Sequence, residues 1–293
     1  MSNTTKRIGI ALGGLVTLVL VAGVGLYVVG SGKIAAAHSV AVSPLAVPAD
    51  SASIARGAHL AQIYGCTDCH GSDLSGLEME NAPPFRLVAS NLTPAGRGAE
   101  YTTAADWDRA IRHGVRPDGT ALFAMPSGAY NKVADTEAVA LIAYLQTLPP
   151  VENDLRGVEW KPMGRLLAAG PIDLASMVYT SAPPKQAPAP DSTVAYGEYV
   201  AKGMCAYCHG ENLEGQIIEG PEEVLAPDLR ASGAWTADQF HRTLTTGVKP
   251  DGTEMDPLVM PWTTTAAMTL AEREGVRRYL AQLGLPPEAT TDT

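Results

Sequence analysis

The stretch Cys66-Thr-Asp-Cys-His-Gly-Ser-Asp-Leu-Ser-Gly76 occurs a second time in the chain, as Cys205-Ala-Tyr-Cys-His-Gly-Glu-Asn-Leu-Glu-Gly215. Further landmarks recur after each copy and in the same order, namely Gly114-Val-Arg-Pro-Asp-Gly-Thr120 with Gly247-Val-Lys-Pro-Asp-Gly-Thr253, Met125-Pro126 with Met260-Pro261, and Tyr144-Leu145 with Tyr279-Leu280. Repeated landmarks in a fixed order indicate a duplicated structural unit. The sequence therefore predicts two homologous domains, residues 51–150 (the first unit) and residues 192–287 (the second unit).

The chain has four cysteines, and each repeat uses two of them in a Cys-x-x-Cys-His string. Two thiols one helical turn apart can each add to a vinyl group of haem, and the adjacent histidine can reach the iron. We expect two covalently bound haem c groups. The residues predicted to hold them are Cys66, Cys69 and His70 in the first unit and Cys205, Cys208 and His209 in the second.

Other uses of such a motif fit the chain less well. A thioredoxin-like redox pair belongs beside a βαβ pattern, and the sequence has none. A zinc site needs four clustered ligands, whereas the repeated positions of each unit offer two cysteines and one histidine.

The second axial ligand of each iron is expected to be a methionine. Met125 and Met260 are the only methionines followed by proline and the only two at matching places in the repeat, and Met255 is the nearest rival. A lone methionine more often fills a gap in a core, but a repeated position favours ligation. His113 and His241 have no repeated counterpart, so we expect them at the surface.

Two protein ligands on each iron would close the metal to substrate. The iron ligands would be His70 with Met125 and His209 with Met260, and a neutral thioether raises the reduction potential relative to a second histidine. We therefore expect a non-catalytic electron carrier. A dihaem enzyme of peroxidase type, or a haem-based gas sensor, would instead need an open iron.

The N-terminal residues 1–30 form a candidate membrane anchor. Ile8 to Val29 carry no charge, and as a helix this run would extend about 33 Å, enough to cross the hydrocarbon core. Lys6 and Arg7 precede it, which predicts a cytoplasmic N-terminus and places the two units on the extracytoplasmic, periplasmic side of the membrane. A cleaved signal peptide is the alternative, with Ala35-Ala36-Ala37 as a cleavage site.

Helix patterns with weak strand signals predict an all-α protein, with two tandem units behind a transmembrane helix. Hydrophobic residues make up 46% of the chain and charged residues 18%, which is typical of packed globular domains. The net charge of −10 argues against nucleic acid as a partner. Residues 151–191 are read as a linker because their end, 182–190, is rich in proline.

The intervening strings bring the chain close to a known group of proteins. Ser90-Asn-Leu-Thr-Pro94, Ala110-Ile-Arg-His-Gly-Val-Arg-Pro-Asp-Gly119, Ala124-Met-Pro126 and Met260-Pro-Trp262 resemble those of membrane-anchored bacterial dihaem cytochromes c of class I type, and of cytochrome c subunits of periplasmic alcohol and gluconate dehydrogenases. The second unit departs from the pattern, with Asp228-Leu-Arg230 in place of Asn91-Leu-Thr93.

The resemblance implies a three-to-five-helix cytochrome c fold in each unit, with His/Met ligation. It also implies single-electron transfer in a respiratory chain. The partners would be redox proteins: a dehydrogenase, a quinol-oxidising complex or a terminal oxidase. A cytochrome subunit of a periplasmic dehydrogenase complex is the alternative role, although such subunits often carry three haems.

Overall fold

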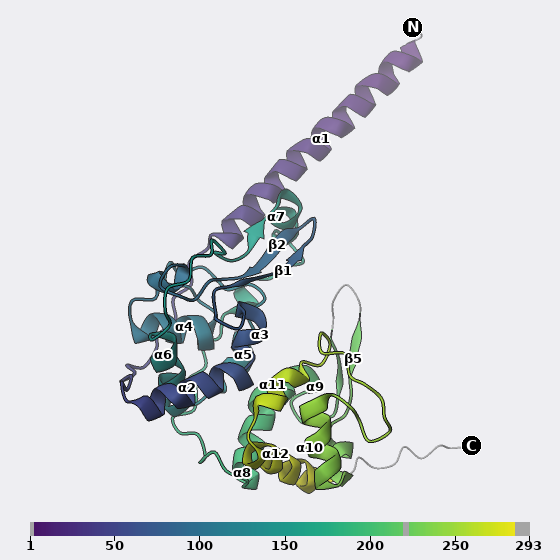
Figure 1. Ribbon diagram of the computed structural model, residues 1–293. Coiled ribbons are helices and arrows are strands. Elements are labelled where there is room, and N and C mark those ends of the chain that lie inside the picture. Colours follow the sequence, from purple (N-terminus) through teal and green to yellow (C-terminus); the bar gives the residue numbers. More distant parts are fainter. Residues whose placement is uncertain (1–2, 219–222, 285–293) are drawn as a thin grey trace, which may run out of the picture.

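The computed structural model describes residues 3–218 and 223–284, and Figure 1 shows their arrangement. Residues 1–2 of the predicted anchor lie outside the described residues, as do residues 219–222 and 285–287 of the predicted second unit. The chain forms two bodies, and a long N-terminal helix, α1 (Asn3–Ile34), projects from the first of them. The helices of the first unit are α2 (Ser51–Ile63), α3 (Cys66–His70), α4 (Ala104–His113), α5 (Ser127–Tyr130) and α6 (Asp135–Leu145).

The second unit repeats this order of elements. Its helices are α8 (Val194–Val200), α9 (Ala206–His209), α10 (Ala237–Thr246), α11 (Trp262–Ala267) and α12 (Leu270–Leu283). Short 3-10 or π turns are η1 (Arg97–Glu100), η2 (Ala175–Met177), η3 (Ala201–Cys205) and η4 (Arg230–Ala234). Capping boxes begin α4, α10 and α12 at Thr103, Thr236 and Thr269, because each threonine accepts a backbone hydrogen bond that the first helical turn cannot satisfy internally.

The all-α expectation is met only in part, because the described residues also contain short strands. β1 (Leu77–Asn81) and β2 (Phe85–Ala89) of the first unit and β3 (Glu159–Trp160) of the predicted linker form an antiparallel sheet in that order. In the second unit β4 (Gln216–Ile218) pairs with β5 (Val224–Ala226). Most of the buried hydrophobic side chains in the core of each unit nevertheless come from helices.

Within each unit the first and last helices cross at a glycine. A Cβ on Gly57 of α2 would lie 2.0 Å from the carbonyl oxygen of Ala140 in α6, and one on Gly197 of α8 would lie 1.9 Å from that of Gly275 in α12. The backbones can approach this closely because glycine has no side chain. Buried Leu60, Leu141 and Leu280 pack beside these crossings.

Much of the predicted linker packs on the first unit. The carbonyl of Leu155 accepts a hydrogen bond from the Asn91 amide at 2.7 Å, and the Tyr179 amide donates to the His113 carbonyl at 3.1 Å. Helix α7 (Pro162–Ala168) lies against the last turns of α1, where Lys33 Nζ donates to the Ala169 carbonyl at 2.9 Å. The base of α1 is thereby fixed to the first unit (Figure 1).

A polar cluster joins the two units. Arg56 of α2 donates to Glu137 of its own unit at 2.5 Å and to Glu272 of the other unit at 2.8 Å. His59 Nε2 lies 2.8 Å from Glu272 Oε2, and the Tyr199 hydroxyl donates to Glu137 at 3.0 Å. Burial works to raise the pKa of Glu272, but the hydrogen bonds from His59 and Arg56 outweigh it and hold that pKa at about 2.

The cluster is arranged with approximate two-fold symmetry. In the first unit Arg56 directly precedes the crossing glycine and donates to Glu137 at 2.5 Å. In the second unit Tyr196 directly precedes the crossing glycine and donates to Glu272 at 3.1 Å. His59 and Tyr199 follow the same glycines and each contacts the glutamate of the opposite unit. This reciprocal pattern is that of an isologous interface.

Candidate functional site

The Cys-x-x-Cys-His segments begin where the first helix of each unit ends. In the first unit Gly65, with φ of 71°, turns the chain from α2 into α3. In the second unit the chain continues through the π turn η3 into α9. Burial raises the pKa of the Cys66 and Cys205 thiols to about 12. Such thiols stay protonated, unlike the thiolates of redox-active or metal-binding cysteines.

Both motif histidines are held by one ring nitrogen. His70 Nδ1 lies 2.7 Å from the Ser90 carbonyl oxygen, and His209 Nδ1 lies 2.7 Å from that of Pro227. A carbonyl can only accept, so Nδ1 carries the proton in both rings and Nε2 keeps its lone pair. Burial lowers the pKa of both imidazoles, which favours the neutral form that binds metal.

The predicted methionines come from irregular loops before short helices. Ala124 has a φ of 68°, a left-handed conformation rare for a residue with a side chain, and Met125 follows it directly. The Met125 carbonyl accepts from the Ser127 amide at 2.8 Å, and the Met260 carbonyl from the Trp262 amide at 2.6 Å. Both loops thus turn tightly at Met-Pro into α5 and α11.

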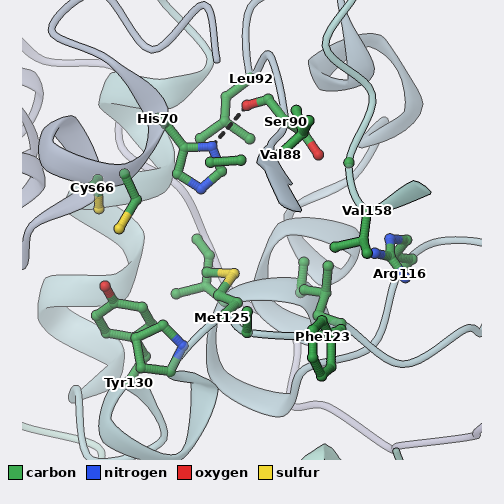
Figure 2. A pocket seen from close by; sticks show the side chains of 18 of the residues that line it. Cys66, His70, Val88, Ser90, Leu92, Arg116, Phe123, Met125, Tyr130 and Val158 are labelled. Atoms are coloured by element: carbon green, nitrogen blue, oxygen red, sulfur yellow. Dashed lines mark hydrogen bonds between the residues drawn. The ribbon is translucent and has the colours of Figure 1, made fainter. Parts of the chain in front are cut away.

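The first unit contains a cavity of about 110 Å³ into which the predicted residues converge. Figure 2 shows His70 and the Met125 sulfur facing each other across the gap, with Cys66 at one side and Arg116 at the other. Cys69 also lines this cavity, and most of the remaining wall is apolar. The arrangement suits a flat apolar ring that is attached at one edge and charged at the opposite edge.

The second unit has a corresponding cavity of about 470 Å³. It is lined by Cys205, His209 and Met260, and also by Met255, the rival methionine. Cys208 is not among its lining residues, although burial raises the pKa of its thiol. The structure thus brings seven of the eight predicted residues to the two cavities, and Cys208 is the one that lines neither.

The two cavities differ in how they are covered. Gly157 and Val158, from the segment after the first unit, line the first cavity, and the neighbouring Trp160 packs edge-on against Phe85 with ring centroids 5.8 Å apart. At the second cavity Leu225 of β5 and Val259 line the opening and are largely exposed. Among the described residues, the second site is therefore the more open one, although Met79 at the first cavity is also half exposed.

Two arginines beside the first cavity have unsatisfied nitrogens. Arg116 lines the cavity, and its buried Nε has no hydrogen-bond partner among the described residues. The same holds for Nε and Nη1 of Arg97, where Glu100 Oε2 lies 3.4 Å from Nη1 without forming a hydrogen bond. Buried guanidinium nitrogens without partners are costly, so this edge of the cavity is built for an anionic group. Haem, which carries two propionates, fits these residues.

One expectation about the histidines is wrong. His113 is not at the surface: it is 2% exposed, because residues from the linker cover it and its Nδ1 lies 2.6 Å from the Tyr179 carbonyl. His241 is part-buried and lies 3.3 Å from Glu274 Oε2. Neither histidine lines either cavity. Arg97 and Arg116 were not predicted, although Arg116 stands in a repeated string that could have pointed to it.

Taken together, helical units that each gather a Cys-x-x-Cys-His segment and a Met-Pro loop around one cavity define the class of c-type cytochromes, which hold haem c covalently. The sequence profile described as cytochrome C oxidase, cbb3-type, subunit III, matches residues 52–145 and 192–280. The match covers more than half of the chain, and the chain belongs to that family.

Similar proteins include cytochrome subunits of dehydrogenases. The chain is 29% identical over 233 residues to the cytochrome c subunit of quinone alcohol dehydrogenase from Gluconacetobacter polyoxogenes, covering 68% of this chain and 49% of the relative. It is 30% identical to the gluconate 2-dehydrogenase cytochrome c subunit of Pantoea cypripedii, covering 66% and 47%. A dihaem cytochrome c-type protein of Cereibacter sphaeroides is 30% identical over 109 residues, covering 33% and 37%. The chain spans about half the length of the first two relatives.

Proposed function

We propose that the chain is a dihaem electron carrier, with one haem c in each of two tandem cytochrome c domains. The observation that carries this proposal is the convergence of cysteine, histidine and methionine on one cavity in each repeat. When bound, haem would supply an iron that takes up and releases single electrons.

The side chains have separate roles in holding the haems. Cys66 and Cys69, and Cys205 and Cys208, would form the thioether bonds. His70 and His209 would offer Nε2 to the irons, because their Nδ1 atoms are committed to backbone carbonyls. Met125 and Met260 would fill the opposite positions and keep external ligands away from both irons, which favours a carrier over a peroxidase or a gas sensor.

The packing of the units supports transfer between the two haems. Thr263, which follows the second Met-Pro, donates to Asp68 of the first Cys-x-x-Cys-His segment at 3.2 Å. In the reciprocal place α5, which follows the first Met-Pro, packs on α9 of the second segment. The cysteine edge of each site thus faces the other unit, so the path between the sites crosses little protein.

The relatives support a place in respiratory electron transfer. Those named as subunits of alcohol and gluconate dehydrogenases suggest a dehydrogenase as donor, and a quinol-oxidising complex or terminal oxidase completes the set of proposed partners. Helix α1 is long and apolar enough to cross a membrane. We propose that it anchors the chain with both units on the periplasmic side, as Lys6 and Arg7 indicate.

Replacement of the methionines tests the proposal. Met260→Ala should open one iron per chain, lower its reduction potential and leave both haems covalently attached, because the sulfur stabilises ferrous iron but does not bind the porphyrin. Oxidised protein should lose half of its methionine-to-iron charge-transfer absorbance, and reduced protein should bind carbon monoxide at one site. Met125→Ala should do the same at the other iron.

Met255→Ala is the matched control, because this methionine lines the same cavity as Met260. It should leave the spectrum unchanged. A Met260→Ala protein with an unaltered spectrum would show that the ligand is misassigned, and unmodified protein with high-spin iron would favour an enzyme of peroxidase type.

A further inference from the structure

The charges that line the two cavities are opposite. Among the described residues that line the first cavity, Arg116 alone has a charged side chain at neutral pH, and none has a carboxylate. The second cavity is lined by Lys249, but also by Asp228, Glu254 and Asp256. The first site is therefore net positive and the second net negative.

The difference arises within one repeated turn. Arg116 and Lys249 take the same place in it, and their amides donate to the carbonyls of Thr120 and Thr253, each at 2.9 Å. The isolated β-bridge that closes the turn pairs Val115 with Ala121 in the first unit and Val248 with Glu254 in the second. A carboxylate therefore stands beside the lysine where a methyl group stands beside the arginine.

The 3-10 turn η4 of the second unit begins with Arg230, and the four-residue 3-10 turn η1 adds a second arginine to the first site. It carries Arg97, whose like charge, after burial, helps to lower the pKa of Arg116. Two neighbouring guanidinium groups with buried, unsatisfied nitrogens repel each other until an anion lies between them. In the second unit Arg230 forms an ion pair with Asp228, with 2.6 Å between Nη2 and Oδ2, so its charge is already neutralised.

We propose that Arg97 and Arg116 bind the propionates of the haem in the first unit and give it a higher reduction potential than the haem in the second unit. This inference rests on the proposed dihaem function. Positive charge near an iron favours the state with the extra electron, and the smaller, better covered first cavity screens that charge less. A single electron passing from the second iron to the first leaves the donor ferric and the acceptor ferrous, with no bond or proton exchanged. Electrons therefore run from the second unit toward the unit on which α1 is fixed.

An optical redox titration of the full-length holoprotein tests this order. It should resolve two waves, and Met260→Ala should move only the lower one, which assigns that wave to the second unit. Arg116→Gln should then lower the midpoint potential of the higher wave by at least about 59 mV, which for one electron is a tenfold change in the ferric-to-ferrous ratio. Arg116→Lys should restore most of the loss, and Arg97→Gln should act in the same direction.

Arg86→Gln is the matched control, because it removes the same charge from the first unit at an arginine that is paired with Glu78 and Glu159 on the sheet. The inference is overturned if Arg116→Gln and Arg97→Gln move the higher wave no more than Arg86→Gln does. It is equally overturned if Met260→Ala moves the higher wave. Glu254→Gln should raise the lower wave, and a fall would contradict the charge argument.

The proposed function is checked on the same samples by counting haems and by the low-spin spectrum. Two covalent low-spin haems with unmoved potentials overturn the propionate inference alone. Fewer than two haems in the unmodified protein overturn the proposed function as well. Resonance Raman bands of the propionate groups give a separate readout, and they should shift in Arg116→Gln but not in Arg86→Gln.

Discussion

Glu272 is the residue on which the contact between the units is centred. It is 1% exposed and receives hydrogen bonds from Arg56 of the other unit and from Tyr196 of its own. A carboxylate so deeply placed stays charged only because several donors surround it. The fixed charge on this residue therefore depends on both units being in place.

The low pKa of Glu272 predicts an acid-dependent loss of stability. Its folded pKa of about 2 lies below the ordinary 4.5, so its stabilising contribution is complete above about pH 4.5 and is lost as the pH falls toward about 2. Glu272→Gln should lower the free energy of unfolding at neutral pH by about 3 kcal/mol, because it leaves Arg56 without that charge partner. The variant should also show a smaller further loss in acid. Urea unfolding followed by far-UV circular dichroism over this pH range checks both effects.

Glu159→Gln is the control for this experiment, because that side chain is 64% exposed. It should change stability by a few tenths of a kcal/mol at most. Equal acid sensitivity in Glu272→Gln and unmodified protein would mean that this carboxylate does not titrate as described.

At the same scale, the repeated spacing was sufficient to predict that cysteine, histidine and methionine gather in each unit, and seven of the eight predicted residues line the two cavities. Their roles in holding haem stay predictions. Arg97 was not predicted, because it lies outside the repeated strings and its unsatisfied nitrogens become evident only from its buried position in the fold. His113 was misjudged because the linker residues that bury it lie far along the sequence.

Among the elements, the crossings of first and last helices set the shape of each unit. Gly57→Ala should force α2 away from α6 and destabilise the first unit by about 2–3 kcal/mol, because its Cβ would meet a backbone carbonyl that cannot move alone. Gly197→Ala should do the same between α8 and α12. Thermal unfolding of the holoprotein measures the effect.

Gly203→Ala serves as the control, since a Cβ at this helical position has nothing within 4 Å. It should leave the melting temperature unchanged or raise it slightly, because alanine favours helix. A Gly57→Ala protein as stable as this control would mean that the helices are free to separate.

Helix positions could be predicted from periodicity and capping residues, whereas the strands could not. All five residues of β1 are exposed, so its sequence lacks the alternation that marks a half-buried strand. β1 pairs with β2 across a short turn, whereas the pairing of β2 with β3 depends on residues brought back by the linker. Such long-range pairing leaves no local signal.

On the scale of the whole molecule, the contact between α1 and α7 bears on whether α1 is removed. A Cβ on Gly30 would lie 1.7 Å from the Arg165 carbonyl oxygen, so the two backbones touch where α1 leaves the first unit. Cleavage near Ala35-Ala36-Ala37 would discard this packed turn. We expect protein from membranes to retain α1 and to need detergent for extraction, which intact mass and carbonate washing check. Soluble protein starting after residue 35 would contradict this expectation.

The reciprocal contacts of Glu137 and Glu272 give the two repeats the geometry of a symmetric pair of subunits, yet one polypeptide carries both. Their encounter is therefore intramolecular, and its equilibrium does not depend on how dilute the protein is. Each chain therefore holds one unit of each kind in contact, at low protein concentration as at high. The covalent connection also lets the two units differ in charge, as their cavities do, because a first unit always has a second unit beside it and not another first unit.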